Sequence, residues 1–509
     1  MADEGRKRKM QRKKGANLMK NLFKKIGALL VAAVMVLSMC TAVFADGNAN
    51  VEIKLKDFEN AQKVEYMQII QKDESTTSGW AFMNGAGACF IEALGMTDSA
   101  DARQEVIWGL IKFNNPNVVL PTGVTAKTVT AADIDLALSK VAGIHGFTEL
   151  TDKTKTKIEV NKAGIYAIKA EEEGYTYKTA TAYVGFGVGV DGSYPVLEDT
   201  EVAAKKSSTS VDKTTTDEDH VVAIGDIVTY TIEAYVPFID AANTTDRTFT
   251  ITDKITGADY YLEGADSISS VTMAGTDPAT KQVGSIAVDP KDKTKFTVNL
   301  NSLVASTDNP NAGKKITVTY TAKVNALTVE NTAGSHVANT EYGANNVPVK
   351  VFTGEITLVK YGDNKENNVL ANAEFEVYKD NATTPLNFKR QENGNYRYAP
   401  DAEDATTTVI TNEEGKIVVE GLDVGSYHFK ETKAPTGYSI NTDGKTIELN
   451  QTGEATAIIT NSDKLNDTKL NSLPATGGMG TYLFTIIGVV VMAGAAGAFF
   501  ISRRKGSEE

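Results

Sequence analysis

Short runs in which apolar and polar residues alternate fill most of the chain between about residues 46 and 464. Val228–Ile232 and Phe296–Leu300 are two such runs, rich in Thr, Val, Ile and Tyr, and Gly, Asn and Asp residues separate one run from the next. Because successive side chains of a strand point to opposite faces, this spacing predicts half-buried antiparallel strands. The pattern is typical of β-sandwiches.

Two stretches in the first third of the chain follow a helical period instead. Asp98 or Ser99 can cap the first helix and Thr130 the second, with Asp133 in its first turn. The apolar residues that share one face are Ala102, Val106, Leu110 and Phe113 in the first helix, and Ile134, Leu138 and Val141 in the second. We therefore predict helical insertions in a β-rich domain.

The whole pattern predicts a mainly β protein built from tandem immunoglobulin-like β-sandwich domains. A chain of 509 residues exceeds what one core supports, and about three domains are expected. The predicted segments are an N-terminal β-rich domain at 46–200, a second sandwich at 203–350, a third at 353–464 and a polar linker at 465–480.

The N-terminal 45 residues have the features of a secretory signal peptide. Lys24 and Lys25 precede an uncharged apolar run, Ile26–Cys40, and a small residue, Ala45, precedes the expected cleavage before Asp46. Leu37–Cys40 resembles a lipidation motif only loosely, because Met39 is larger than the small residue expected before the cysteine.

The C-terminal end predicts one transmembrane helix. Thr481–Ile501 is an uncharged run of 21 residues, which as a helix would span about 30 Å, the thickness of a bilayer core. The tail at 502–509 contains Arg503, Arg504 and Lys505. Positive charge favours the cytoplasmic side, so the preceding domains are expected outside the cell.

Composition and charge exclude several other classes. The net charge is -13 for the whole chain and -22 for Asp46–Thr476, which argues against a nucleic-acid binder. The chain has two cysteines, and Cys40 lies in the signal peptide, so Cys89 remains as a core thiol without a disulfide partner. The glycines 185, 187 and 189 and the four scattered histidines fit no dinucleotide or metal motif. No cofactor or metal is expected.

The sequence Leu473, Pro474, Ala475, Thr476, Gly477, followed by an apolar helix and a basic tail, resembles the cell-wall sorting signal of Gram-positive surface proteins. The resemblance implies that a sortase thiolate attacks the carbonyl of Thr476, releases the chain from Gly477 onward and passes the acyl group to an amine. The alternative is an ordinary tail-anchored membrane protein.

Residues 353–464 resemble the collagen-adhesin B-type domain. The stretches that carry the resemblance are Gly354–Lys360, Ala373–Tyr378, Gly421–Tyr427 and Glu431–Tyr438. In that family a lysine of the first strand forms an isopeptide bond with an asparagine of the last strand, assisted by a glutamate. By position, the resemblance implies Lys360, Asn461 and Glu431.

The second sandwich resembles the middle domain of fimbrial backbone subunits, through Gly225–Ile232 and Ile251–Asp253. There an aspartate takes the part of the glutamate, which implies a bond between Lys213 and Asn339 assisted by Asp253. Lys206 and Asn325 are alternative partners.

Burial explains why this chemistry needs these residue types. A low-dielectric surrounding disfavours both charged forms, so it lowers the pKa of a lysine and raises that of a carboxyl group. The neutral amine is a nucleophile, and the protonated carboxyl can polarise the amide and pass a proton to the departing ammonia. Each site reacts once, so the protein is not expected to be an enzyme.

We therefore expect a structural subunit of a sortase-assembled pilus, secreted and anchored to the cell wall. The family uses an acceptor lysine between its first two domains, often after Tyr-Pro, but Val196 follows Tyr194 and Pro195 here, which leaves Lys205 or Lys206. The implied partners are pilin-specific and housekeeping sortases, identical subunits, minor pilins and peptidoglycan. The alternative is a monomeric wall-anchored adhesin that binds a host protein or glycan.

Overall fold

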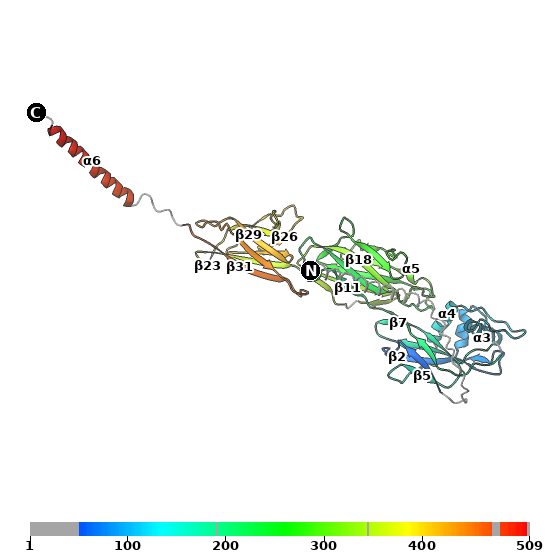
Figure 1. Ribbon diagram of the computed structural model, residues 1–509. Helices are drawn as coiled ribbons and strands as arrows, with labels where there is room; N and C mark the ends of the chain where they lie inside the picture. The colour runs from blue at the N-terminus through cyan, green and yellow to red at the C-terminus, as the bar shows by residue number, and fades with distance from the viewer. Residues whose placement is uncertain (1–49, 190–191, 344–345, 471–478, 506–509) are drawn as a thin grey trace, which may run out of the picture. The chain divides into compact units, whose positions relative to one another are not determined.

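The computed structural model describes residues 50–189, 192–343, 346–470 and 479–505 (Figure 1). The chain forms two compact units. The first contains the chain up to Glu218, Ile227–Asn325 and Val329–Lys350, and the second contains Asp219–Asp226, Ala326–Thr328 and the chain from Val351. Strands dominate both units, which confirms the prediction of a mainly β protein.

Two sheets and three helices form the N-terminal part of the first unit. One sheet has the order β5-β1-β9, and the other has the order β3-β2-β6-β8, with β4 also paired to β2. The strands are β1 (Val51–Lys56), β2 (Lys63–Lys72), β3 (Trp80–Phe82), β4 (Thr148–Glu149), β5 (Lys157–Val160), β6 (Gly164–Glu171), β7 (Tyr175–Lys178), β8 (Ala180–Val184) and β9 (Thr200–Ala203). The helices are α2 (Ala86–Ala93), α3 (Ala100–Asn114) and α4 (Ala131–Ala142).

Both expected helices form, and each begins directly after its predicted N-cap residue, Ser99 or Thr130. Ser99 Oγ accepts a hydrogen bond from the amide of Ala102 at the start of α3. Thr130 and Asp133 make a reciprocal capping box at the start of α4. Helix α2 was not predicted from the sequence, and its N-terminus has no side-chain cap.

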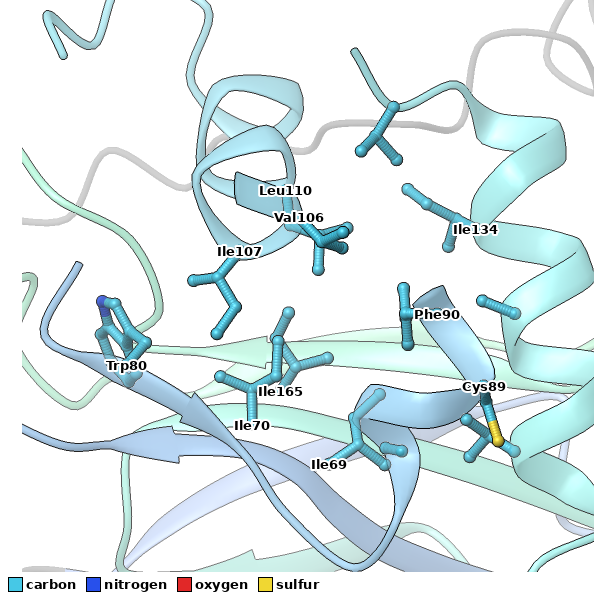
Figure 2. Close-up of a cluster of buried hydrophobic side chains, with 14 of the residues drawn as sticks. Ile69, Ile70, Trp80, Cys89, Phe90, Val106, Ile107, Leu110, Ile134 and Ile165 are labelled. Atoms are coloured by element: carbon cyan, nitrogen blue, oxygen red, sulfur yellow. The ribbon is translucent and has the colours of Figure 1, made fainter. Parts of the chain in front are cut away.

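The three helices and the β2–β6 sheet enclose an apolar core (Figure 2). Ile69 and Ile70 of β2 and Ile165 of β6 pack with Trp80, Phe90, Val106, Ile107, Leu110 and Ile134. Cys89 lies among them with 8% of its surface exposed, and burial raises the pKa of its thiol. The cysteine is therefore a core thiol, as predicted.

The C-terminal part of the first unit is a sandwich of two sheets. One sheet has the order β11-β12-β18-β14 with β15 also on β18, and the other has the order β16-β17-β13-β19-β20 with β21 also on β19. The elements are β11 (Asp212–Thr215), β12 (Ile227–Tyr235), β13 (Phe249–Thr256), β14 (Ala258–Tyr260), β15 (Ser269–Met273), β16 (Ile286–Val288), β17 (Lys295–Asn299), α5 (Asn301–Val304), β18 (Lys315–Val324), β19 (Thr328–Val337), β20 (Thr340–Tyr342) and β21 (Val349–Phe352). The strand β10 (Lys205–Ser208) precedes this sandwich and pairs with β7.

The second unit is another two-sheet sandwich. Its sheets have the orders β23-β22-β28-β26-β25 and β27-β24-β29-β30, and the last strand, β31, pairs with the first, β22, in parallel. The strands are β22 (Gly354–Gly362), β23 (Lys365–Val369), β24 (Glu374–Lys379), β25 (Phe388–Arg390), β26 (Tyr396–Tyr398), β27 (Thr408–Ile410), β28 (Lys416–Leu422), β29 (Gly425–Lys433), β30 (Lys445–Leu449) and β31 (Ile459–Asp467). Their inward side chains, such as Phe375, Phe388 and Phe429, form one core.

A helix, α6 (Met479–Lys505), follows near the C-terminus. Within the part of the chain that the structure describes, no helix is both long and apolar enough to cross a membrane. The signal peptide with Ala45 and Asp46, the sorting motif and the side chains at both ends of α6 lie outside the described residues. The expected transmembrane span, Thr481–Ile501, is therefore described only in part.

Candidate functional site

Each sandwich buries one lysine against carboxylate groups. The second-domain cluster is the group of residues around Lys213 in the sandwich of the first unit, the second domain of the sequence prediction. Lys213 lies on β11, opposite Ile232 of β12, and its side chain is 4% exposed. Its Nζ donates hydrogen bonds to Asp253 Oδ2 and to Tyr320 Oη, the latter at 2.6 Å. Asp253 comes from β13 of the facing sheet, with a fully buried side chain. The sandwich therefore closes over an amine and a carboxyl group in contact, as the sequence predicted for these two residues.

Two tyrosine hydroxyls complete the shell of Asp253. Tyr260 donates to Oδ1 at 2.7 Å and Tyr320 donates to Oδ2 at 2.9 Å. Burial is the largest influence on the pair: it lowers the pKa of Lys213 to about 8 and raises the pKa of Asp253, while the mutual attraction of the two charges opposes both shifts. The surroundings thus shift both groups toward their neutral forms.

The structure brings Asn331 to this cluster, which the sequence reasoning missed. Asn331 lies on β19, is fully buried, and donates from Nδ2 to Tyr320 Oη at 2.8 Å. Its Oδ1 is buried and has no hydrogen-bond partner among the described residues. The alternation of Val329, Asn331 and Ala333 was the signal that could have placed it on the inner face.

The two asparagines that the sequence suggested do not reach Lys213. Asn339 is exposed in the turn between β19 and β20, because the strand has already ended at Val337. Asn325 is exposed and donates to Asp259 Oδ2 at 2.7 Å. Lys206, the alternative to Lys213, bonds Glu172 instead. In the structure Asn331, and not Asn339 or Asn325, belongs to the cluster around Lys213, which it reaches through the hydroxyl of Tyr320.

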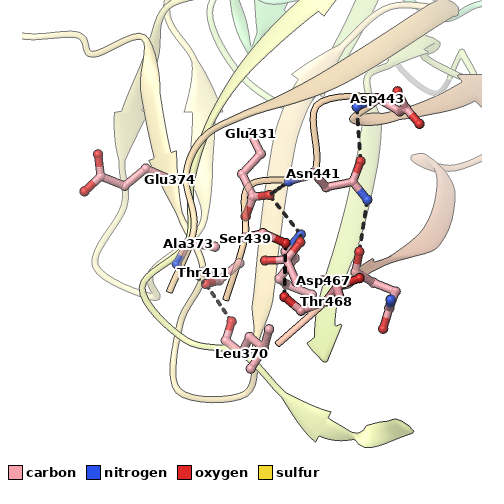
Figure 3. A network of polar contacts seen from close by, with 12 residues as sticks. Leu370, Ala373, Glu374, Thr411, Glu431, Ser439, Asn441, Asp443, Asp467 and Thr468 are labelled. Atoms are coloured by element: carbon pink, nitrogen blue, oxygen red, sulfur yellow. Dashed lines mark hydrogen bonds and ion pairs between the residues drawn. The ribbon is translucent and has the colours of Figure 1, made fainter. Parts of the chain in front are cut away.

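The third-domain cluster is the group of residues around Lys360 of β22, in the sandwich of the second unit. The side chain of Lys360 is fully buried. Its Nζ donates to Glu431 Oε2 of β29 at 3.2 Å and to Asp467 Oδ1, at the end of β31. The amide of Asn441 also donates to Glu431 Oε2, at 2.7 Å. Figure 3 shows Glu431, Asn441 and Asp467 converging at this point.

Two carboxyl groups share this single buried amine. Glu431 Oε1 and Asp467 Oδ2 are buried without hydrogen-bond partners among the described residues. Burial raises the pKa of Glu431, and the nearby Asp467 adds to the effect. Two buried carboxyl groups beside one amine favour the protonated form of Glu431, the direction in which burial moves its pKa.

Asn461, the partner expected for Lys360, lies elsewhere. It is exposed, and its Nδ2 donates to the carbonyl of Glu448 at 2.7 Å. The parallel register sets Asn461 opposite Ile356, whereas Lys360 is opposite Leu465. Four residues along a strand are about 13 Å. The structure therefore keeps Asn461 away from Lys360 and places Asp467 in contact with it.

The two candidate acceptor lysines lie side by side on β10 but in different surroundings. Lys206 Nζ bonds Glu172 Oε2 at 2.7 Å and lies 4.5 Å from the ring centroid of Tyr175. Lys205 is exposed as a residue and faces Lys178 across the β10–β7 pair. Partial desolvation of its amine, and then the charge of Lys178, lower the pKa of Lys205.

Comparison with known families gives two matches in the C-terminal part of the chain. Residues 354–463 match the SpaA family of prealbumin-like fold domains. Residues 466–508 match the LPXTG cell wall anchor motif. The motif that the sequence indicated at Leu473–Gly477 lies within the second match.

One curated relative is the trypsin-resistant surface T6 protein of Streptococcus pyogenes serotype M6. It is 39% identical over 85 residues, which are 17% of this chain and 14% of the relative. The match therefore spans about one seventh of that protein's length.

Two pilins are among the solved structures that the chain matches. The T6 backbone pilin of Streptococcus pyogenes is 14% identical, with a TM-score of 0.49 and coverage of 80% of this chain and 81% of the other. The full-length major pilin SpaD of Corynebacterium diphtheriae is 16% identical, with a TM-score of 0.46 and coverage of 85% and 100%.

The two family matches follow each other in the order that the sequence pattern indicated, a domain at 353–464 and then a sorting signal. The chain carries a prealbumin-like domain of the SpaA family at residues 354–463 and, at residues 466–508, an LPXTG motif that anchors it to the cell wall.

Proposed function

We propose that the chain is a backbone subunit of a sortase-assembled pilus, braced internally by isopeptide bonds between Lys213 and Asn331 and between Lys360 and Asp467. The observation that carries the proposal is the burial of each lysine in contact with a carboxyl group, with a second acyl side chain in the same cluster. That side chain is Asn331, which the Tyr320 hydroxyl connects to Lys213, or Asp467, which Lys360 contacts directly. A lysine buried in this way is costly unless it is paired or reacts. Formation of an amide removes the charge permanently.

The two bonds differ in what they release. In the second domain, Nζ of Lys213 attacks Cγ of Asn331, and ammonia leaves as the new amide forms. In the third domain, Nζ of Lys360 attacks Cγ of protonated Asp467, and water leaves, with Glu431 accepting and returning the proton. Confinement of both groups in a core supplies a high effective concentration, on the order of 10⁵ M or more in favourable cases.

Mass spectrometry of the mature chain tests both bonds. We expect the loss of one ammonia and one water, assigned to the two sites by cross-linked peptides. Asp467→Ala should abolish the water loss, whereas Asn461→Ala, on the same strand, should keep it. Asn331→Ala and Asn339→Ala form the corresponding pair in the second domain. A wild-type chain with unchanged mass would refute the bonds.

For polymerisation, we propose that Thr476 is joined to Lys205 of the neighbouring subunit. Lys205 is exposed and no ion pair involves it within the described residues, whereas Lys206 is held by Glu172 and two aromatic rings. A neutral amine is the form that resolves an acyl-enzyme, and the lowered pKa of Lys205 moves its amine in that direction.

Two charge-conserving variants test this assignment in cells that contain the sortases. Lys205→Arg should abolish the ladder of covalent polymers that resists boiling in detergent, and Lys206→Arg should keep it. The reverse result would make Lys206 the acceptor. A single wall-linked species from the unaltered chain would support the monomeric adhesin instead.

A further inference from the structure

The hydroxyl of Tyr320 touches every member of the second-domain cluster. It accepts hydrogen bonds from Lys213 Nζ at 2.6 Å and from Asn331 Nδ2 at 2.8 Å, and it donates to Asp253 Oδ2 at 2.9 Å. A phenolic hydroxyl has one proton to donate and two lone pairs that accept, so its bonding capacity is filled. No other side chain bridges these three residues in the described structure.

The two nitrogens that Tyr320 joins are the two that exchange places in the reaction. Nζ of Lys213 must lose a proton when it becomes an amide, and Nδ2 of Asn331 must gain one to leave as ammonia. Among the described contacts, Asp253 has no hydrogen bond to Asn331, and the hydroxyl of Tyr320 lies between them. The carboxyl group therefore has no direct route to the leaving nitrogen.

We propose that Tyr320 is a catalytic residue of the second-domain isopeptide bond, and that its hydroxyl relays the proton from the amine of Lys213 to the departing nitrogen of Asn331. This inference rests on the proposed function, because it assumes that the bond forms. Asp253 first takes the extra proton of the lysine ammonium group, which leaves a neutral amine.

The step balances in atoms and charge. Once Asp253 holds the lysine proton, the hydroxyl of Tyr320 is free to turn its own proton from Asp253 toward Nδ2. The bond from Nζ to Cγ of Asn331 forms, the hydroxyl accepts a proton from Nζ and gives its own proton to Nδ2, and the bond from Cγ to Nδ2 breaks. Ammonia leaves, the amide remains, and Tyr320 ends as the neutral phenol. Burial raises the pKa of Tyr320 well above its usual value, which keeps the phenol protonated before the reaction.

Neighbouring aromatic rings fix the position of the Tyr320 ring. It is fully buried, meets Phe296 edge-to-face at a centroid distance of 4.9 Å, and stacks on Tyr230 at 5.8 Å. A fixed ring keeps the hydroxyl in line with both nitrogens, and proton transfer between positioned groups contributes a rate factor of about 10² to 10⁴.

Tyr230 provides a matched control. Its ring is also fully buried, and Lys213 Nζ lies 5.5 Å from its centroid, close to the 5.0 Å for Tyr320. Its hydroxyl, however, has no hydrogen-bond partner among the described residues. Tyr320→Phe and Tyr230→Phe therefore remove the same atom from two stacked rings, and only the first removes the proposed relay.

The experiment follows bond formation in the full-length chain during cell-free synthesis. Samples are quenched in acid at intervals and digested, and the peptide that joins residues 213 and 331 is quantified by mass spectrometry. We expect Tyr320→Phe to slow its appearance by at least tenfold and Tyr230→Phe to leave the rate unchanged. The peptide that joins residues 360 and 467 should form at the wild-type rate in both variants.

The possible failures are distinguishable. If the unaltered chain never forms the 213–331 peptide, the proposed bond itself is refuted. If the unaltered chain and Tyr320→Phe form it equally fast, only the relay is overturned. Thermal unfolding of Tyr320→Phe is compared with that of Lys213→Met, which also lacks the bond. A much lower unfolding temperature for Tyr320→Phe would show a structural role and would also overturn the relay.

Discussion

The two buried lysines share one chemical problem and have different neighbours. Lys213 faces one carboxyl group and a tyrosine hydroxyl, whereas Lys360 faces two carboxyl groups. The difference matches the two acyl partners. An amide carries its own leaving nitrogen, while a carboxylic acid must be protonated before hydroxide can leave as water.

The stability of a variant that cannot form the second-domain bond should depend on pH. In Asn331→Ala, Lys213 keeps its amine, with a pKa near 8 in the folded state and 10.5 in the unfolded state. The unfolded chain then binds more protons between these values, so the free energy of unfolding rises with pH, by up to about 3 kcal/mol.

Asp253 has the opposite effect at lower pH. Its raised pKa means that the folded state keeps a proton that the unfolded state has lost, so stability falls as pH rises above 3.8. Denaturant unfolding of Asn331→Ala between pH 4 and 10 should therefore pass through a minimum. The double variant Lys213→Met/Asn331→Ala should lack the rise above pH 8, and a rise that persisted there would contradict the assignment.

At the scale of elements, the helices α3 and α4 could be predicted because their signals are local. A cap residue and an apolar period lie within a few residues of each other in the sequence. The contacts of Lys213 with Asp253 and of Lys360 with Glu431 match the residues that the resemblance implied, because these residues lie on strands with distinctive neighbours.

The proposed acyl partners, Asp467 and Asn331, could not be predicted in the same way. Asp467 meets Lys360 only because β31 pairs with β22 in one parallel register, between strands about 100 residues apart. Asn331 and Lys213 lie on strands of two different sheets, and the hydroxyl of Tyr320 connects them. Register and sheet packing depend on contacts distant in sequence, whereas a conspicuous asparagine such as Asn339 or Asn461 is also a common turn or edge residue.

Close packing beneath α3 gives a test at this scale. A Cβ added at Gly109 would lie 2.3 Å from the carbonyl oxygen of Lys127 and 2.7 Å from Val129 Cγ2. Gly109→Ala should therefore push the helix away from residues 127–129 and destabilise the N-terminal core by about 1–3 kcal/mol, despite the better helix propensity of alanine.

Gly143, after the end of α4, provides the control. A Cβ there would meet its nearest neighbour at 3.5 Å, with an ordinary right-handed backbone. Thermal unfolding followed by tryptophan fluorescence, which reports Trp80 and Trp108 in this core, would compare the two variants. Equal unfolding temperatures would show that the helix moves without cost.

At the scale of the molecule, the proposed bonds close two covalent rings, residues 213–331 and 360–467. For a ring of roughly 100 residues, the chain-entropy estimate is about 4.7 kcal/mol of stabilisation. Lys360→Met should therefore lower the unfolding temperature of the third domain strongly. Asn461→Ala, which leaves Lys360 and Asp467 in place, should leave it nearly unchanged in calorimetry.

Tension along a polymer would pass through each isopeptide bond and would not load the residues between its two ends. Between Lys205 and Thr476, the longest stretch outside the rings is 332–359, which fully extended is roughly 95 Å at about 3.4 Å per residue. Single-molecule stretching of the unaltered chain should show no single unfolding step longer than this stretch. Lys213→Met should add the contour of residues 214–330, roughly 400 Å, and the absence of that increment would refute a load-bearing bond.

The closed rings also change what a single proteolytic cut can do. In a linear chain, one cleaved peptide bond separates everything on its two sides. Within 214–330 or 361–466, the same cut would open a ring, and the other arm of that ring would still join the two ends. A single cut would sever the fibre only in one of the short connections outside the rings. Most residues of the longest connection, 332–359, belong to the strands β19–β22.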